Sequence, residues 1–458
     1  MTPLHFEIKN YTEGTEIEFI DLKVTDLNGR LHHLTLPFSE KTMAMLLNDG
    51  IGFDGSSYGF QKVENSDMIM KPDVKTALID PFRNAPTLSF MTRVFNTDAH
   101  NTPYQFDLRN MAEETEKLLG DHGIAAASQW GPELEFYIFH DAQYRSDAKH
   151  SFFSIESDEE FLANGYHIAN PFDVHDDFRD EATKILEKSG IEVKYHHHEV
   201  GNLGQQEIEL YFNRLLPTAD NIVLGKYILH NLAREKGLFL TFMPKPVYKQ
   251  AGSGLHLHHY LVDNANANSF FQQGSYANLN ETALFYIGGI LKHAAALCAF
   301  TNPSTNSYKR LVPGVEAPTA INFGQANRAS CVRIPRYIKD PQKTRFEYRP
   351  PDATANPYIA MSALMLAGID GVVNKIDPRK EGFGPYEADA FDPNIEIKYL
   401  PFSITQSLQS LESDHSFLLR GNIFSEQLVQ HWIKIKSDEF NQVSNWPSPI
   451  EYSMYFDL

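Results

Sequence analysis

Glutamate and histidine side chains recur in this sequence at spacings that suit a pair of metal ions. They are Glu133 and Glu135 in Gly131-Pro-Glu-Leu-Glu-Phe136, Glu199 and Glu207 at the two ends of Glu-Val-Gly-Asn-Leu-Gly-Gln-Gln-Glu, His256 in Gly252-Ser-Gly-Leu-His256, and Glu347 in Arg345-Phe-Glu-Tyr-Arg349. Five carboxylates at one site would repel one another strongly, whereas two divalent cations would nearly neutralise them. The pattern therefore predicts a two-cation site.

The Glu-x-Glu pair suggests how such a site would be built. On a strand, residues i and i+2 point to the same face, so Glu133 and Glu135 could each hold a different ion. A charged pair on a strand usually faces solvent, but apolar residues flank this one on both sides. A donor set of mostly oxygen with one imidazole favours Mg²⁺ or Mn²⁺ over zinc. The His196–His198 triplet does not change this, because three consecutive side chains cannot all face one ion.

Arginine is concentrated in one part of an otherwise acidic chain. The formal net charge is −19, which argues against a nucleic-acid partner bound through its phosphates. Between residues 310 and 349, however, lie six arginines: Arg310, Arg328, Arg333, Arg336, Arg345 and Arg349. Guanidinium groups bind carboxylates and phosphates in a bidentate manner, so this segment is expected to bind an anionic substrate. Neither a P-loop nor a Gly-x-Gly-x-x-Gly fingerprint is present, so a nucleotide would need another architecture.

The elements expected to carry these residues divide the chain near residue 100. Residues 17–25 and 30–36 are strand-like and flank Asp26-Leu-Asn-Gly29, a hairpin signal, so residues 1–102 are predicted to form a β-rich domain. Beyond it, helices are expected at 107–120 and 178–188 and a strand at 134–139. This alternation predicts an α+β catalytic domain over residues 103–458.

The chain is expected to be cytoplasmic. The longest apolar run, residues 284–300, contains Lys292 and His293 and is interpreted as a buried helix rather than a membrane span. The first residues lack a basic segment followed by an apolar one, and two cysteines are too few for a disulfide framework.

The motifs together resemble the type I glutamine synthetases over nearly the whole chain. The resemblance rests on residues 52–57 (GFDGSS), 65–68 (NSDM), 131–136, 197–201 (HHEVG), 204–207 (GQQE), 241–246 (TFMPKP), 252–256 (GSGLH), 302–318, 349–352 (RPPD) and 355–358 (ANPY). It implies an N-terminal β-grasp domain, a larger α+β catalytic domain, and a homo-oligomer, a dodecamer of two stacked hexamers with active sites shared between neighbours.

The resemblance also implies roles for individual residues. The family reaction joins glutamate and ammonium in two steps: ATP phosphorylates the glutamate side chain, and ammonia then displaces the phosphate. One metal would be held by Glu135, Glu199 and Glu207 and the other by Glu133, His256 and Glu347, with two to three ions per subunit. By the same resemblance, Asp54 of a neighbouring chain would accept the ammonium proton, and Glu316 would close over the intermediate. Arg328 and Arg333 would bind the phosphate, and glutamate would be held by Gly252, Arg310 and Arg349. The residues near ATP would be Tyr166, Phe212, His258 and Arg345.

Four positions depart from the family pattern, and three interpretations stay open. Ala251, Lys194, Tyr260 and Gln342 replace residues that are usually Asn, Glu, Ser and a basic residue, which affects the nucleotide contacts more than the metals. The leading interpretation is ATP-dependent synthesis of glutamine from ammonia. The alternatives are a γ-glutamyl-amine ligase that uses a larger amine, and a non-catalytic oligomeric scaffold with the same fold.

Overall fold

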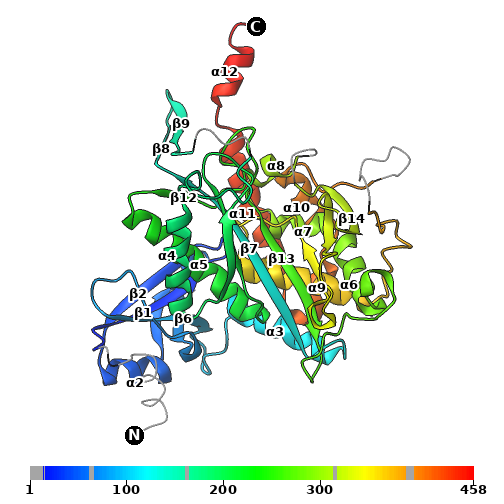
Figure 1. The fold of residues 1–458 in the computed structure, drawn as a ribbon. Coiled ribbons are helices and arrows are strands. Elements are labelled where there is room, and N and C mark those ends of the chain that lie inside the picture. The colour runs from blue at the N-terminus through cyan, green and yellow to red at the C-terminus, as the bar shows by residue number, and fades with distance from the viewer. Residues whose placement is uncertain (1–13, 15, 61–65, 160–163, 313–316, 388–396) are drawn as a thin grey trace.

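Two β-sheets, each accompanied by helices, make up the molecule in the computed structural model (Figure 1). The structure describes residues 14, 16–60, 66–159, 164–312, 317–387 and 397–458. The smaller sheet is built from the N-terminal segment, and the larger one carries the predicted metal ligands.

The N-terminal sheet has the order β2-β1-β6-β4-β3, with β5 paired to β6. Its elements are β1 (Phe19–Thr25), β2 (Leu31–Pro37), α2 (Glu40–Asn48), β3 (Ile51–Asp54), β4 (Asp67–Pro72), β5 (Leu78–Ile79) and β6 (Thr87–Asn96), with one-turn helices η1 (Gly55–Tyr58) and η3 (Val74–Thr76). The predicted hairpin is confirmed: β1 and β2 pair antiparallel, and Gly29 has φ +85°, which the turn requires. β1 and β6 run parallel, so the sheet is mixed.

The large sheet follows the order β10-β11-β7-β13-β16-β15-β14, with β12 paired to β7. Its strands are β7 (Ala127–Phe139), β10 (Val193–His198), β11 (Gln205–Leu210), β12 (Phe239–Thr241), β13 (Leu255–Val262), β14 (Ala320–Gln325), β15 (Ser330–Ile334) and β16 (Phe346–Tyr348). The predicted strand at 134–139 is thus the second half of β7, which begins seven residues earlier. Because β7 lies in the middle of the sheet, its residues have neighbours on both sides.

Helices pack around the large sheet and extend beyond it. They are α3 (Leu108–Asp121), α4 (Asp176–Lys188), α5 (Leu215–Glu235), α6 (Glu281–Lys292), α7 (Ala294–Thr301), α8 (Ser307–Arg310), α9 (Pro357–Val373), α10 (Ile404–Ser413), α11 (Glu426–Ser444) and α12 (Pro449–Tyr455), with short helical turns η4 (Tyr276–Asn278), η5 (Pro341–Lys343) and η6 (Ser416–Asn422). The two predicted helices are confirmed as α3 and α4, and Asp107 caps α3 by accepting a hydrogen bond from the Asn110 amide. Residues 357–371 of α9 are all buried, so this helix forms the centre of the core.

The apolar run at 284–300 is buried as predicted, but it is not one helix. The chain bends by 73° between α6 and α7, at His293. The His293 imidazole lies in the core, 2.8 Å from Asp414 and 3.1 Å from Asp370, and these polar partners fix the bend. In the described part of the chain no single helix has the length and apolar composition of a membrane span. Taken together, α6 and α7 have that length and composition, but they are bent by 73°.

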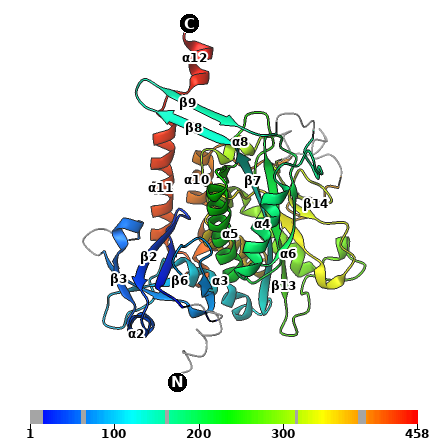
Figure 2. The same ribbon diagram turned by 60° about the vertical axis from the view of Figure 1, so that its left-hand side comes forward.

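A two-stranded hairpin and the last helix project from the rest of the molecule (Figure 2). The hairpin is formed by β8 (Asp141–Ser146) and β9 (Ser151–Glu156), and it lies at the same end of the molecule as α12. Both expose large apolar side chains, among them Tyr144, Phe153, Tyr455 and Phe456. Exposed apolar groups on projecting segments are typical of protein interfaces.

A buried ion pair ties the N-terminal segment to the core helices. Arg109 on α3 donates to both carboxylate oxygens of Asp220 on α5, at 3.0 and 2.8 Å, and its third nitrogen lies 3.0 Å from Asp73 of the N-terminal segment. Tyr358 on α9 donates to the same Asp220 carboxylate at 2.6 Å. Arg109 is 5% exposed and Asp220 is 6% exposed, so water cannot replace either partner.

Asp220→Ala is expected to lower the free energy of unfolding by about 3–5 kcal/mol, because it leaves the buried Arg109 guanidinium without its main partner. Differential scanning calorimetry of the variant would measure this loss. Glu114→Ala on α3, the helix of Arg109, breaks an exposed pair with Lys117 and serves as the control, with an expected cost below about 1 kcal/mol. Equal effects of the two substitutions would contradict the prediction.

Candidate functional site

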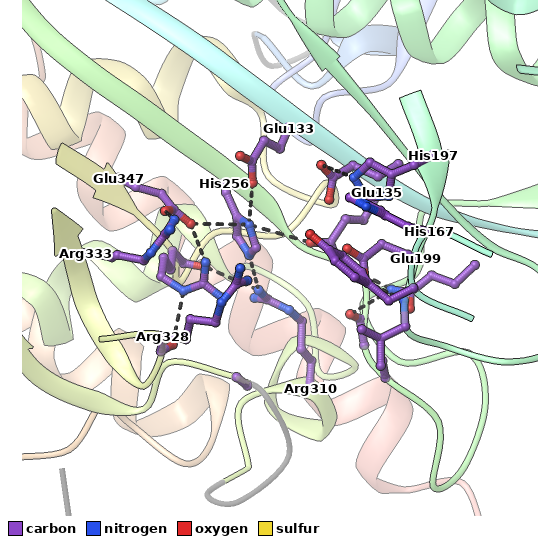
Figure 3. A pocket seen from close by; sticks show the side chains of 18 of the residues that line it. Glu133, Glu135, His167, His197, Glu199, His256, Arg310, Arg328, Arg333 and Glu347 are labelled. Atoms are coloured by element: carbon purple, nitrogen blue, oxygen red, sulfur yellow. Dashed lines mark hydrogen bonds and ion pairs between the residues drawn. The ribbon is translucent and has the colours of Figure 1, made fainter. Parts of the chain in front are cut away.

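The register of the large sheet brings the predicted ligands together. Glu133 on β7 lies directly opposite His256 on β13 and Glu209 on β11, while Glu135 lies opposite Glu207. Directly paired residues point to the same face of a sheet, with Cβ atoms about 5 Å apart. The side chains of Glu133, Glu135, Glu207 and His256 line a cavity of about 990 Å³ (Figure 3).

One half of the cluster contains positively charged partners. Glu133 lies 2.8 Å from Nδ1 of His256 and 2.8 Å from Nε2 of His258, and Glu347 accepts hydrogen bonds from Arg333 and Arg349. Burial opposes ionisation of Glu347, but Arg349 and other nearby cations outweigh it and lower its pKa to about 2. The same balance, with His258 and His256 as the cations, holds the pKa of Glu133 well below its ordinary value.

The other half lacks such partners. Burial, together with repulsion from Glu135 and Glu207, raises the pKa of Glu199 to about 9. Burial and the neighbouring carboxylates also raise the pKa of Glu207 well above its ordinary value. Glu199 and Glu207 are therefore protonated at neutral pH unless a bound cation displaces the protons.

This donor set fits divalent cations. Ligand atoms of Glu133, His256 and Glu347 all lie within 4.8 Å of one another, and so do those of His197, Glu199 and Glu207. Glu135 lies between the groups: one oxygen accepts from the Gly254 amide at 2.7 Å, and the other is 3.6 Å from His256. Carboxylate oxygens with single imidazoles suit Mg²⁺ or Mn²⁺.

Addition of Mg²⁺ at pH 7 is expected to release about one to two protons per subunit, since Glu199 and Glu207 must ionise to bind a cation. Calorimetric titrations in two buffers of different ionisation enthalpy would count these protons. At pH 9.5 the release should be smaller, because Glu199, with a pKa of about 9, is by then largely ionised. Binding heats that are the same in both buffers at pH 7 would contradict the prediction.

The histidine triplet follows the alternation of its strand. His197 faces the cavity, 3.3 Å from Glu207. His198 instead forms a fully buried pair with Glu159 at 2.7 Å, and His196 accepts from Arg179 at 3.2 Å. The three side chains therefore do not converge on one point. His197 was not among the predicted site residues, although strand alternation with Glu199 could have identified it.

Four predicted arginines border the same cavity (Figure 3). Arg310 donates to the carbonyl of Pro350 at 2.7 Å and lies 3.4 Å from His256. The backbone at Gly252 approaches it so closely that an added Cβ would lie 2.6 Å from Arg310. Arg328, Arg333 and Arg349 complete the group, which faces the carboxylate cluster. The arrangement can hold an anion between arginines and metal-binding carboxylates.

Three of the four residues predicted near ATP form one group. Arg345 lies over the Phe212 ring, 5.3 Å from its centroid, and donates to His258 at 3.4 Å. Tyr166 is separate from them in its contacts: it stacks on His167 at 4.1 Å between ring centroids, beside His197. Tyr166 lines the cavity, whereas Phe212, His258 and Arg345 are not among the residues that line it.

The four departures have identifiable contacts. Lys194 forms an ion pair with Glu209 at 2.7 Å, and the Tyr260 ring lies 5.3 Å from that of Phe212. The carbonyl of Ala251 accepts from the Tyr137 hydroxyl at 2.7 Å, and the side chain of Gln342 accepts from the Asn268 amide at 3.0 Å. Gln342 therefore supports a neighbouring loop. Tyr260 lies beside Phe212, which was predicted near ATP, and Lys194 pairs with Glu209, the cross-strand neighbour of the predicted ligand Glu133.

Asp54 lies outside this protomer's cavity. It caps η1 and accepts hydrogen bonds from Ser56 and Ser57, which lower its pKa to about 2. The carboxylate is therefore firmly ionised and exposed. Glu316 lies outside the described residues.

Comparison with known proteins identifies the family. Residues 105–455 match the family described as glutamine synthetase, catalytic domain, and residues 16–97 match glutamine synthetase, beta-Grasp domain. The chain belongs to the glutamine synthetase family. The resemblance found in the sequence is confirmed, as is the fold class of a β-grasp domain followed by a large α+β catalytic domain.

Curated relatives and solved structures agree along the whole chain. Glutamine synthetases of Streptomyces coelicolor and Frankia alni are 40% and 38% identical, and each alignment covers 99% of both chains. The cryo-EM structure of Plasmodium falciparum glutamine synthetase has a TM-score of 0.88 at 26% identity, covering 99% of both chains. A structure titled apo GmaS has a TM-score of 0.83 at 25% identity, covering 98% of both. The chain is thus an enzyme of this family, a ligase of glutamate with ammonia, and not a non-catalytic scaffold.

Proposed function

We propose that this enzyme makes glutamine in two steps, with ATP phosphorylating glutamate to γ-glutamyl phosphate and ammonia then displacing the phosphate. The observation that carries the proposal is the pairing across the large sheet, which gathers carboxylates on one wall of a cavity bordered by arginines. A free carboxylate is a poor electrophile, so it needs activation before an amine can attack it. Phosphorylation supplies a good leaving group.

Glu133, His256 and Glu347 would hold one divalent cation, and Glu199 and Glu207, with Glu135 or His197, would hold the other. When bound, the cations neutralise phosphate charge while the γ-phosphoryl group moves. Phe212, His258 and Arg345 lie at the Glu133 end of the cluster, which supports placing the nucleotide there. Tyr166 would contact the nucleotide from within the cavity that it lines.

The arginines would orient glutamate and the transferred group. Arg310 is fixed by the carbonyls of Pro350 and Pro351, so its second terminal nitrogen is directed toward the cavity beside His256. Together with Arg349 and Gly252 it would hold the glutamate carboxylates, while Arg328 and Arg333 would bind the phosphoryl oxygens. Such positioning can contribute roughly 7–11 kcal/mol in well-oriented reactions.

The amine would be bound by Asp54 of a neighbouring subunit. Its ionised carboxylate suits an ammonium cation, from which it would accept a proton, and its exposure outside the cavity of its own chain supports a shared site. Glu316 would then exclude water from the acyl phosphate. We propose a dodecamer of two stacked hexamers, and the projecting apolar hairpin and α12 support such an assembly.

A panel of amines tests the proposal. ATP-dependent phosphate release would be measured with purified protein, Mg²⁺ and glutamate, comparing ammonium with monoamines and polyamines. Turnover with ammonium that yields glutamine is the expected result. Turnover only with a larger amine would replace the proposal by a γ-glutamyl-amine ligase.

A further inference from the structure

A further buried carboxylate lies beside the carboxylate cluster. Glu209 is 0% exposed and stands directly opposite Glu133 in the β7–β11 pairing. Ligand atoms of Glu133, Glu209 and His258 all lie within 4.8 Å of one another, as in the two clusters described above. One oxygen of Glu209 is buried without a hydrogen-bond partner. Buried carboxylates are normally paired or bound to a cation, so Glu209 needs positive charge nearby.

Lys194 supplies that charge through an irregularity in β10. The β10–β11 register shifts between Val193 and Tyr195, so Lys194 is the extra residue of a β-bulge. A bulge changes the direction of a side chain, and here it places the Lys194 ammonium 2.7 Å from Glu209 and 4.9 Å from the centre of the Tyr195 ring. The side chain of Lys194 is 26% exposed, so the ammonium group connects the buried carboxylate with the solvent side.

We propose that Lys194 takes the place of a third divalent cation at the position formed by Glu133, Glu209 and His258. This inference rests on the proposed function, because it assumes that the other two clusters bind metal. Two carboxylates and an imidazole form an oxygen-rich set that suits Mg²⁺ or Mn²⁺. With the ammonium paired to Glu209, the position already carries a compensating positive charge, and a third ion is excluded.

The neighbouring charges support this exchange. Glu133 has the imidazoles of His256 and His258 at 2.8 Å, whereas among the described residues Glu209 forms its ion pair with Lys194 alone. Removal of the ammonium group would leave Glu209 uncompensated next to Glu133, and would open a space connected to solvent. A metal ion or a proton can then restore neutrality, and the proximity of Glu133 favours the metal because it adds a second ligand.

The number of bound Mn²⁺ ions tests the inference. Full-length protein would be titrated with Mn²⁺ without nucleotide, and free Mn²⁺ would be followed by its electron paramagnetic resonance signal. Native protein is expected to bind about two ions per subunit and Lys194→Met about three, while Lys194→Met combined with Glu209→Gln should return to about two. Lys236→Met, which breaks the exposed pair with Glu181, is the matched control and should leave the number unchanged.

Each other outcome has a defined meaning. If Lys194→Met keeps the native unfolding midpoint and still binds only two ions, a proton has replaced the ammonium and the inference is wrong. It is also wrong if the third ion persists when Glu209 is changed. If Lys194→Met unfolds early, Lys194→Gln gives the same comparison with a polar side chain. Native protein that binds no Mn²⁺ would instead overturn the proposed two-metal function.

Discussion

Asp54→Asn is expected to lower kcat/KM for ammonium by about 10²- to 10⁴-fold, the usual contribution of a positioned acid–base group. The amide has nearly the same shape, but it carries no charge to attract ammonium and cannot accept its proton. Initial rates of phosphate release at varied ammonium concentration would measure the loss. Steady-state constants for ATP should change much less, because Asp54 is proposed to contact the amine and not the nucleotide.

Asp98→Asn is the matched control for this variant. Asp98 lies in the same N-terminal segment and is also exposed, and hydrogen bonds from Thr102 lower its pKa just as hydroxyl groups do for Asp54. It caps a turn and has no proposed contact with substrate, so activity should stay within a factor of about two. A similar loss in both variants would indicate that Asp54 acts through the fold of its domain and not through the amine.

Strand periodicity explains why Glu133 and Glu135 could be predicted to face one site. Alternation places Glu133 and Glu135 on one face, and this holds in any sheet that contains the strand. The same rule separates His197 from His196 and His198, whose side chains have partners on the opposite side. The sequence could not reveal which strands are adjacent, so the pairing of Glu135 with Glu207 rested on family resemblance until the register was known.

Features that break the regular period were missed. The bulge at Lys194 adds one residue to β10, and local sequence gives no signal that this lysine turns toward Glu209. The bend at His293 likewise depends on Asp370 and Asp414, which lie far away in the sequence. In both places a distant carboxylate decides the local geometry, so a prediction from neighbouring residues cannot succeed.

Glu133→Gln is expected to lower kcat/KM by about 10²- to 10³-fold, equivalent to about 3–4 kcal/mol of transition-state stabilisation. Glutamine keeps the volume of the side chain but removes the charge that contacts both His256 and His258. The affinity for the cation therefore falls, and both imidazoles lose a contact that orients them. Mn²⁺ titration should show at least a tenfold weaker site. Glu116→Gln is the control: this carboxyl accepts from Ser128 on the same strand β7, outside the cavity, and native Mn²⁺ binding is expected.

Mixed oligomers of Asp54→Asn and Glu133→Gln subunits would show whether the two groups meet across subunits. Each variant alone lacks one group at every site. If a site combines Glu133 of one chain with Asp54 of its neighbour, random co-assembly restores both groups at about one quarter of the sites, and activity returns to that fraction. If Asp54 served its own chain, no mixture could contain an intact site and activity would stay at the level of the separate variants. Because Asp54 does not line the cavity of its own chain, we expect the recovery.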